Sequence, residues 1–259
     1  MMRLIKAELR KFFSTKTWLL LLIGTVLFSL VPVVITLSFA GRDAGNGQAP
    51  LPKITAPQIQ ELVLSGPSSA TIFIAILGVI GITQEYRHRT ATPTFLTTPA
   101  RWKVIVAKLI TYLGLGVVYA AIAAVFVIAL SALWINGAGG SFTLAGNNWK
   151  ILVGAAIAAA LYGIVGVGFG ALVRNQIGAV VGLLAYMFVI ENILAGIPAT
   201  RDIYRLLPGG ASSALYTYAD RPGAVIHLLT PVQGGILLAA YGIVFAIIAL
   251  FVSTRREVS

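Results

Sequence analysis

The fold is decided by an uncharged stretch near the amino terminus, residues 17–41: Thr17-Trp-Leu-Leu-Leu-Leu-Ile-Gly-Thr-Val-Leu-Phe-Ser-Leu-Val-Pro-Val-Val-Ile-Thr-Leu-Ser-Phe-Ala-Gly41. These 25 residues separate Lys16 from Arg42, and most of them are aliphatic or aromatic. A helix of about 20 such residues is long enough to cross the hydrocarbon core of a bilayer. The stretch is longer than the apolar part of a secretion signal, and residues 1–16 precede it with helical periodicity. It therefore predicts a membrane-spanning helix.

Composition places the whole chain in the same class. Of its 259 residues, 58% are hydrophobic and only 10% are charged, whereas an ordinary soluble domain has about a quarter charged residues. The 27 glycines and 11 prolines show no collagen-like period, which argues against fibrous and disordered chains. Cysteine is absent, so disulfides, thiolate catalysis and cysteine-based zinc sites are excluded.

Further uncharged runs predict five more spans. We expect an all-α polytopic membrane protein in which residues 1–259 form one transmembrane domain. Its spans are expected at 17–40, 67–84, 104–135, 149–173, 176–197 and 231–252. An interfacial helix at 1–16, a cytoplasmic loop at 85–101 and an outer segment at 198–230 complete it, and short helices in the outer segment are expected to dip back into the membrane.

The charges are distributed as this topology requires. The chain carries 19 Lys and Arg against 8 Asp and Glu, a net charge of +11. With both termini inside, the inner segments carry +10 and the outer side only +1. This asymmetry follows the positive-inside rule of membrane proteins. It explains the basic charge without nucleic acid, which we exclude as a partner.

The first sixteen residues have an amphipathic pattern. On a helical wheel one side carries apolar residues and the opposite side carries basic ones; the two sets are Met2, Ile5, Leu9, Phe12 and Phe13, and Arg3, Lys6, Arg10 and Lys11. This pattern predicts a helix lying on the cytoplasmic leaflet, with its basic side toward anionic lipid or a protein partner. A simple topology anchor explains it equally well.

Residues for catalysis by the chain itself are missing. His88 and His227 fall on opposite sides of the predicted membrane, so they cannot share a metal ion. No HExxH motif and no Walker A sequence occurs. We therefore expect neither an enzyme nor a nucleotide site in this chain, and any ATP must be bound by another polypeptide.

The fifth predicted span contains one acid, Glu191. It lies about 21 Å along the helix from the inner end, at 1.5 Å per residue. It could face a central cavity together with Asn192, where a cationic or amphipathic substrate passes. Alternatively it forms a structural pair with Arg201 or Arg205, which we favour because it lies close to the outer interface. Residues proposed for a substrate pathway are Ser69, Phe73, Tyr186, Glu191 and Asn192.

The most specific pattern is the cytoplasmic stretch 81–108. Its basic residues follow from the positive-inside rule. That rule does not explain the apolar pair Phe95-Leu96, which lies between Pro93 and Pro99 outside the membrane. An apolar knob on a rigid turn is suited to docking in a groove of a partner protein.

This stretch resembles the signature of ABC-2 type transporter permease subunits, particularly actinobacterial ones. The resemblance is carried by Glu85-Tyr-Arg-His-Arg-Thr90, Phe95-Leu96, Pro99, Arg101 and Ala107-Lys108. The amino-terminal helix, the six spans and the outer segment are similar too, so essentially the whole chain is covered. Arg89 departs from the family pattern, which often has glycine there.

The resemblance implies a coupling helix between the second and third spans, docked in a cleft of the ATPase subunit. It assigns this role to Glu85, Tyr86, Arg87, Arg89, Thr90, Phe95, Leu96, Pro99, Arg101 and Lys108. ATP and Mg²⁺ would be bound by two ATPase subunits, so the chain itself has no cofactor. A second permease protomer, identical or paralogous, would complete an exporter of a drug, lipid or other hydrophobic compound in the plasma membrane.

Two other functions stay open. A non-transporting anchor or sensor subunit would use the same docking element. An ion-coupled carrier without an ATPase is disfavoured, because such carriers have several buried ionisable residues in their spans.

Overall fold

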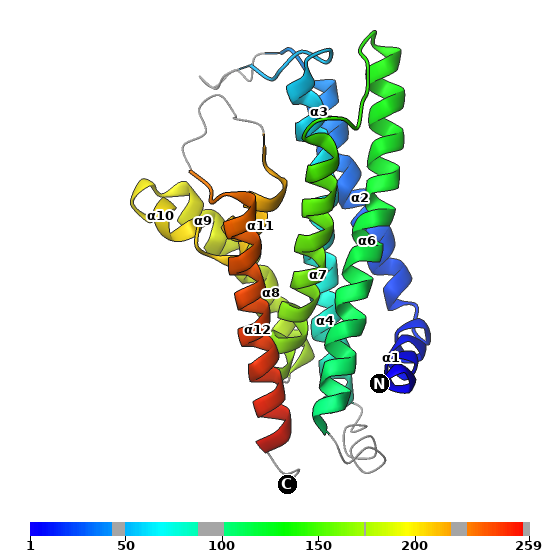
Figure 1. Ribbon diagram of the computed structural model, residues 1–259, viewed down its shortest axis with the longest axis vertical. Helices are drawn as coiled ribbons and strands as arrows, with labels where there is room; N and C mark the ends of the chain where they lie inside the picture. The colour runs from blue at the N-terminus through cyan, green and yellow to red at the C-terminus, as the bar shows by residue number, and fades with distance from the viewer. Residues whose placement is uncertain (43–49, 88–100, 174, 219–226, 256–259) are drawn as a thin grey trace.

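The computed structural model describes residues 1–42, 50–87, 101–173, 175–218 and 227–255. These residues are almost entirely helical and contain no β-strand. Six of the helical segments are long and apolar enough to cross a membrane. The predicted all-α fold with six spans is confirmed at this level (Figure 1).

The helices run largely along one axis of the molecule (Figure 1). Their bounds, in chain order, are α1 (Met2–Phe13), α2 (Thr17–Ser38), α3 (Pro57–Leu64), a 3₁₀ turn η1 (Gly66–Ser69), α4 (Ala70–Arg87), α6 (Arg101–Gly137), α7 (Asn148–Val173), α8 (Gln176–Ala185), a π-helical segment η2 (Tyr186–Ile190), α9 (Glu191–Gly196), a 3₁₀ turn η3 (Pro198–Thr200), α10 (Arg201–Tyr204), α11 (Pro208–Tyr216) and α12 (Pro231–Arg255).

The centre of the bundle is formed by α4 and α7. In the most apolar windows of their spans 67% of the residues are buried, compared with 17% for the spans of α2 and α12. The helix α7 packs against α4, α6 and α12. In water the exposed Leu, Ile and Val side chains of α2 and α12 would be unfavourable, and a bilayer supplies the apolar surroundings that they need.

Small residues let α7 approach its neighbours closely. A β-carbon at Gly78 of α4 would lie 2.7 Å from the carbonyl oxygen of Gly163 in α7, so the two backbones touch there. The close packing that the glycine pattern predicts is confirmed along α7, at Gly163, Gly166, Gly168 and Gly170. It is not found at Gly178 and Gly182 of α8, where a β-carbon would meet only side-chain atoms at ordinary contact distances.

The second span differs from the prediction because the residues before position 67 are helical as well. The region before residue 67 has no strong sequence periodicity, yet α3 and η1 occupy residues 57–69. Pro57 begins α3 at a position where no intrahelical N–H is needed. Ile59, Val63 and Leu64 are almost completely buried. Two helical turns give too few residues to make this spacing visible in the sequence.

The fifth span is interrupted near its middle. It consists of α8, the π-helical segment η2 and α9, and the chain then leans away from the other helices through α9 and α10 (Figure 1). The Asn175 side chain caps α8 by accepting a hydrogen bond from the Gly178 N–H at 3.0 Å. The helices α10 and α11 form in the outer segment, where one or two short helices are predicted, and α11 packs on α7 and α12.

One end of the bundle collects the segments that the charge pattern places inside. The helix α1, the beginning of α6 and the carboxyl-terminal end of α12 lie at the lower end in Figure 1, and the loop between α6 and α7 lies at the upper end. This arrangement agrees with an even number of crossings. The assignment of the lower end to the cytoplasm stays a prediction from the positive-inside rule.

Candidate functional site

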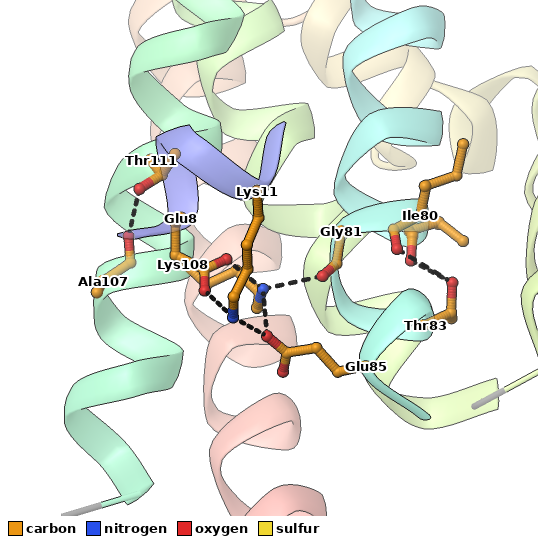
Figure 2. Close-up of polar contacts among 10 residues, drawn as sticks. Glu8, Lys11, Ile80, Gly81, Thr83, Glu85, Ala107, Lys108 and Thr111 are labelled. Atoms are coloured by element: carbon orange, nitrogen blue, oxygen red, sulfur yellow. Dashed lines mark hydrogen bonds and ion pairs between the residues drawn. The ribbon is translucent and has the colours of Figure 1, made fainter. Parts of the chain in front are cut away.

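Four charged side chains from three helices meet beside α1, which lies at the lower end of the bundle in Figure 1, and Figure 2 shows their contacts. Lys11 Nζ lies 2.9 Å from Glu8 Oε1 and 2.9 Å from Glu85 Oε1. Lys108 Nζ lies 3.2 Å from Glu85 Oε1 and is also paired with Glu8. We call Glu8, Lys11, Glu85 and Lys108 the ion cluster. It joins α1, α4 and α6.

Three of the four members of the ion cluster are buried, and its charges balance. The side chain of Lys108 is 1% exposed, and those of Glu8 and Glu85 are 6% and 7% exposed. Lys108 Nζ also donates a hydrogen bond to the Gly81 carbonyl oxygen at 2.9 Å. Buried charges require this kind of pairing, because an uncompensated ion in the protein interior is strongly destabilising.

Lys11 is the cluster member at its edge, with a side chain 46% exposed. Burial lowers the pKa of Lys11, but the negative charges of Glu8 and Glu85 raise it more, so the net shift is upward from the usual value. Lys11 therefore stays cationic over the physiological range.

Local helical geometry places these residues. Glu8 and Phe12 are one turn apart on α1, and both are buried against the bundle. Glu85 lies in the last turn of α4 before residues 88–100, and Lys108 lies two turns into α6 after them. The cluster therefore ties together the two helices that flank the 88–100 segment.

The residues predicted for coupling fall into three groups, according to how much of each the structure describes and where it lies. Glu85 and Lys108 lie in the ion cluster, buried within helices and not in an exposed loop. Tyr86, Arg87 and Arg101 belong to α4 and α6, but their side chains are not among those described. The remaining predicted positions lie outside the described residues; they are Arg89, Thr90, Phe95, Leu96 and Pro99.

Sequence reasoning missed two members of the ion cluster. The helical pattern places Lys11 on the basic side of the first helix, facing lipid or a partner, and gives Glu8 no role. One signal was present: Glu8 is the only acid in residues 1–16, and it lies one turn from Phe12. Pairing with Glu85 and Lys108 could not be deduced, because they are 74 or more residues away.

A second polar site is a cavity of about 500 Å³ between α2, η1, η2 and α11. Ser69 and Glu191 are among its lining residues, as are Tyr204, Ser213 and Tyr216. Phe28 and Phe188 form part of its apolar wall. The cavity combines one carboxylate, several hydroxyl groups and an aromatic surface.

Glu191 is held without a basic partner among the described residues. It is 6% exposed, and its Oε1 accepts a hydrogen bond from the Gly209 N–H at 2.8 Å. The favoured pairing with Arg201 or Arg205 is not found. Arg205 lies 3.6 Å from Asp202 instead, and the Arg201 Nε donates to the Ala195 carbonyl oxygen.

The other residues proposed for a substrate pathway differ in whether they lie at this cavity. Tyr186 interacts with the Glu191 carboxyl group. The Phe73 ring packs against the Phe28 ring, with 5.9 Å between centroids, and is not part of the cavity wall. The exposed Asn192 side chain donates to the Phe188 carbonyl oxygen of its own helix at 2.8 Å. The structure therefore places Ser69 and Glu191 on the same cavity wall and Tyr186 beside Glu191, whereas Phe73 and Asn192 are not part of that wall.

Comparison with known proteins does not assign a function. No protein-family model matches the chain, and no curated protein sequence matches it significantly. No group of three or more His, Asp or Glu side chains that could hold a metal ion occurs among the residues that the structure describes. The function must therefore be inferred from the chain's own residues and their geometry.

Proposed function

We propose that the chain is the membrane-spanning permease subunit of an ATP-driven exporter, acting as a dimer with separate ATPase subunits. Three features support the proposal together. The stretch 85–108 resembles the coupling region of ABC-2 permeases, no Walker A sequence is present, and six apolar helices are available to form a pathway.

The observation that carries the proposal is the ion cluster at the base of the coupling region. It connects both helices that flank residues 88–100 to each other and to α1. Separating these helices would leave buried charges unpaired, which costs about 3–5 kcal/mol for the buried pairs of Lys108 and less for those of the half-exposed Lys11. A force applied by an ATPase at this end would therefore move α1, α4 and α6 as one unit.

That movement would reach the rest of the bundle through α4. This helix packs along α7, and their close backbone contact at Gly78 leaves little room for sliding. The exposed apolar sides of α2 and of the fifth span would face lipid or the second protomer. A drug, lipid or other hydrophobic compound would pass between the protomers.

The test is purification of the tagged chain from its native membranes, followed by measurement of bound ATPase activity. We expect wild-type chain to retain an ATPase. The double variant Phe95→Asp/Leu96→Asp should lose it, because charge on the apolar knob opposes docking. The matched control is Phe39→Asp/Leu144→Asp, which changes one exposed Phe and one exposed Leu at the opposite end of the bundle and should retain the activity.

The outcome separates the alternatives. An ATPase that copurifies but is never stimulated by a transported compound would indicate an anchor or sensor subunit. Absence of any ATPase, with transport that survives ATP depletion and requires an ion gradient, would indicate an ion-coupled carrier and overturn the proposal.

A further inference from the structure

The starting point is the Glu191 carboxyl group, which is buried and has no basic partner among the described residues. Its side chain lies on the wall of the cavity of about 500 Å³ and is 6% exposed. The Gly209 N–H donates to it at 2.8 Å and the Tyr186 side chain also interacts with it, but no described basic side chain forms an ion pair with it. A buried carboxylate without a counter-ion is costly, and a cation entering the cavity would remove that cost.

The rest of the cavity wall has a polar part and an apolar part. Hydroxyl groups on one part come from Tyr204, Ser213 and Tyr216, which can accept hydrogen bonds from an ammonium group. Phe28, Met187 and Phe188 supply an apolar part, and aromatic faces attract cations as well as hydrocarbon. The volume lies within the range of pockets that enclose a drug-sized molecule.

We infer that this cavity binds an amphipathic cation, a protonated amine attached to an apolar body, with its charge at Glu191. The inference names the substrate class of the proposed permease and rests on that proposed function for the transport step alone. Binding itself requires only the residues of this chain.

The chain around Glu191 is built in a way that sets the carboxyl group's position. Glu191 directly follows the π-helical segment, whose Met187 and Phe188 lie on the same cavity wall. A π-helical segment shifts the register of the residues after it and is frequent at functional sites. On the opposite side, a β-carbon at Gly209 would collide with the Glu191 carboxylate, so glycine there permits the close contact.

The test measures binding to the purified full-length chain in lipid nanodiscs, with neither ATPase nor ATP present. The probe is dansylcadaverine, a fluorescent apolar molecule with one primary amine, and the comparison is its N-acetylated derivative, which has no positive charge. We expect wild-type chain to bind the amine at least about tenfold more tightly, because the loss of a buried charge partner reduces affinity by that much or more.

Variants locate the effect. Glu191→Gln keeps the side chain's size and its acceptor for Gly209, and should abolish the preference for the amine. Gly209→Ala should weaken amine binding by displacing the carboxylate. Glu61→Gln is the matched control: it removes another carboxylate, which the Asn147 amide contacts at 3.4 Å, and should leave both affinities unchanged.

Equal binding of the amine and its N-acetylated derivative to wild-type chain would overturn the inference, and this result does not depend on any variant folding. Undiminished amine preference in Glu191→Gln would overturn it too. The proposed function can fail separately from this inference. Amine binding without a copurifying ATPase would refute the permease function and leave the binding site standing. A copurifying ATPase without a preference for the amine would refute only the binding site.

Discussion

Replacing Lys108 by methionine probes the ion cluster most sharply. The ammonium group of Lys108 is paired with Glu8, lies 3.2 Å from Glu85 and donates to the Gly81 carbonyl oxygen at 2.9 Å. Methionine keeps the apolar length of the side chain and removes the charge. Two buried carboxylates then share Lys11 alone. We expect the free energy of unfolding to fall by about 3–5 kcal/mol, as for other broken buried pairs.

A second variant separates charge balance from packing. Glu85→Gln combined with Lys108→Met leaves Glu8 paired with Lys11 and restores neutrality. The double variant should therefore be more stable than Lys108→Met alone, with a coupling energy of about 1–3 kcal/mol between the two positions. The matched control is Lys103→Met on the exposed surface of α6, for which we expect a change within about 0.5 kcal/mol.

The assay is reversible unfolding of the purified chain in mixed micelles of mild detergent and sodium dodecyl sulfate, followed by circular dichroism. Two results would refute the reasoning. One is a loss for Lys108→Met no larger than that for Lys103→Met. The other is simple additivity of the single substitutions, which would mean that Glu85 and Lys108 do not stabilise one another.

Three further predictions follow from the packing and the topology. Gly78→Ala should push α4 away from α7 and lower the free energy of unfolding by about 1–3 kcal/mol. The control Gly114→Ala has open space around it and should be neutral or stabilising. Equal effects of the two variants in unfolding titrations would contradict this prediction. Tyr119→Phe removes a 2.6 Å hydrogen bond to a carbonyl oxygen of α2 and should cost about 1 kcal/mol in the same titrations, an unchanged midpoint being the contrary result. In the cysteine-free chain, Lys103→Cys should resist an impermeant thiol reagent applied to intact cells, and Leu144→Cys should react; the reverse pattern would invert the topology.

The membrane-spanning helices could be predicted because burial in lipid leaves a local signature. Hydrocarbon excludes charge along the whole length of a span, so an uncharged window marks it without knowledge of the neighbours. The close approach of α7 was also predictable, since glycines spaced along one helix act through their own small size. The fold class and the six spans therefore followed from the sequence.

The two polar sites were harder to predict from the sequence because they depend on contacts between residues far apart in the chain. Lys11 looks like one of several basic residues of an amphipathic helix, and only the packing of α1 on α6 places it beside Glu85. The environment of Glu191 depends on α11 folding back to present the Gly209 N–H. A helical wheel or an uncharged sequence window describes one helix at a time, so it cannot show which other helix supplies the interacting residue.

The central claim, that residues 85–101 dock on an ATPase, can be tested by photo-cross-linking. A benzophenone amino acid is introduced in place of Leu96, and, as the control, in place of Leu144 in the loop between α6 and α7, which lies at the upper end of the bundle in Figure 1. After irradiation of native membranes, the adducts are identified by mass spectrometry. The account predicts an adduct with a Walker A-containing ATPase at position 96 and none at position 144. Adducts at position 96 that contain only lipid, or only proteins without a nucleotide-binding site, would contradict it.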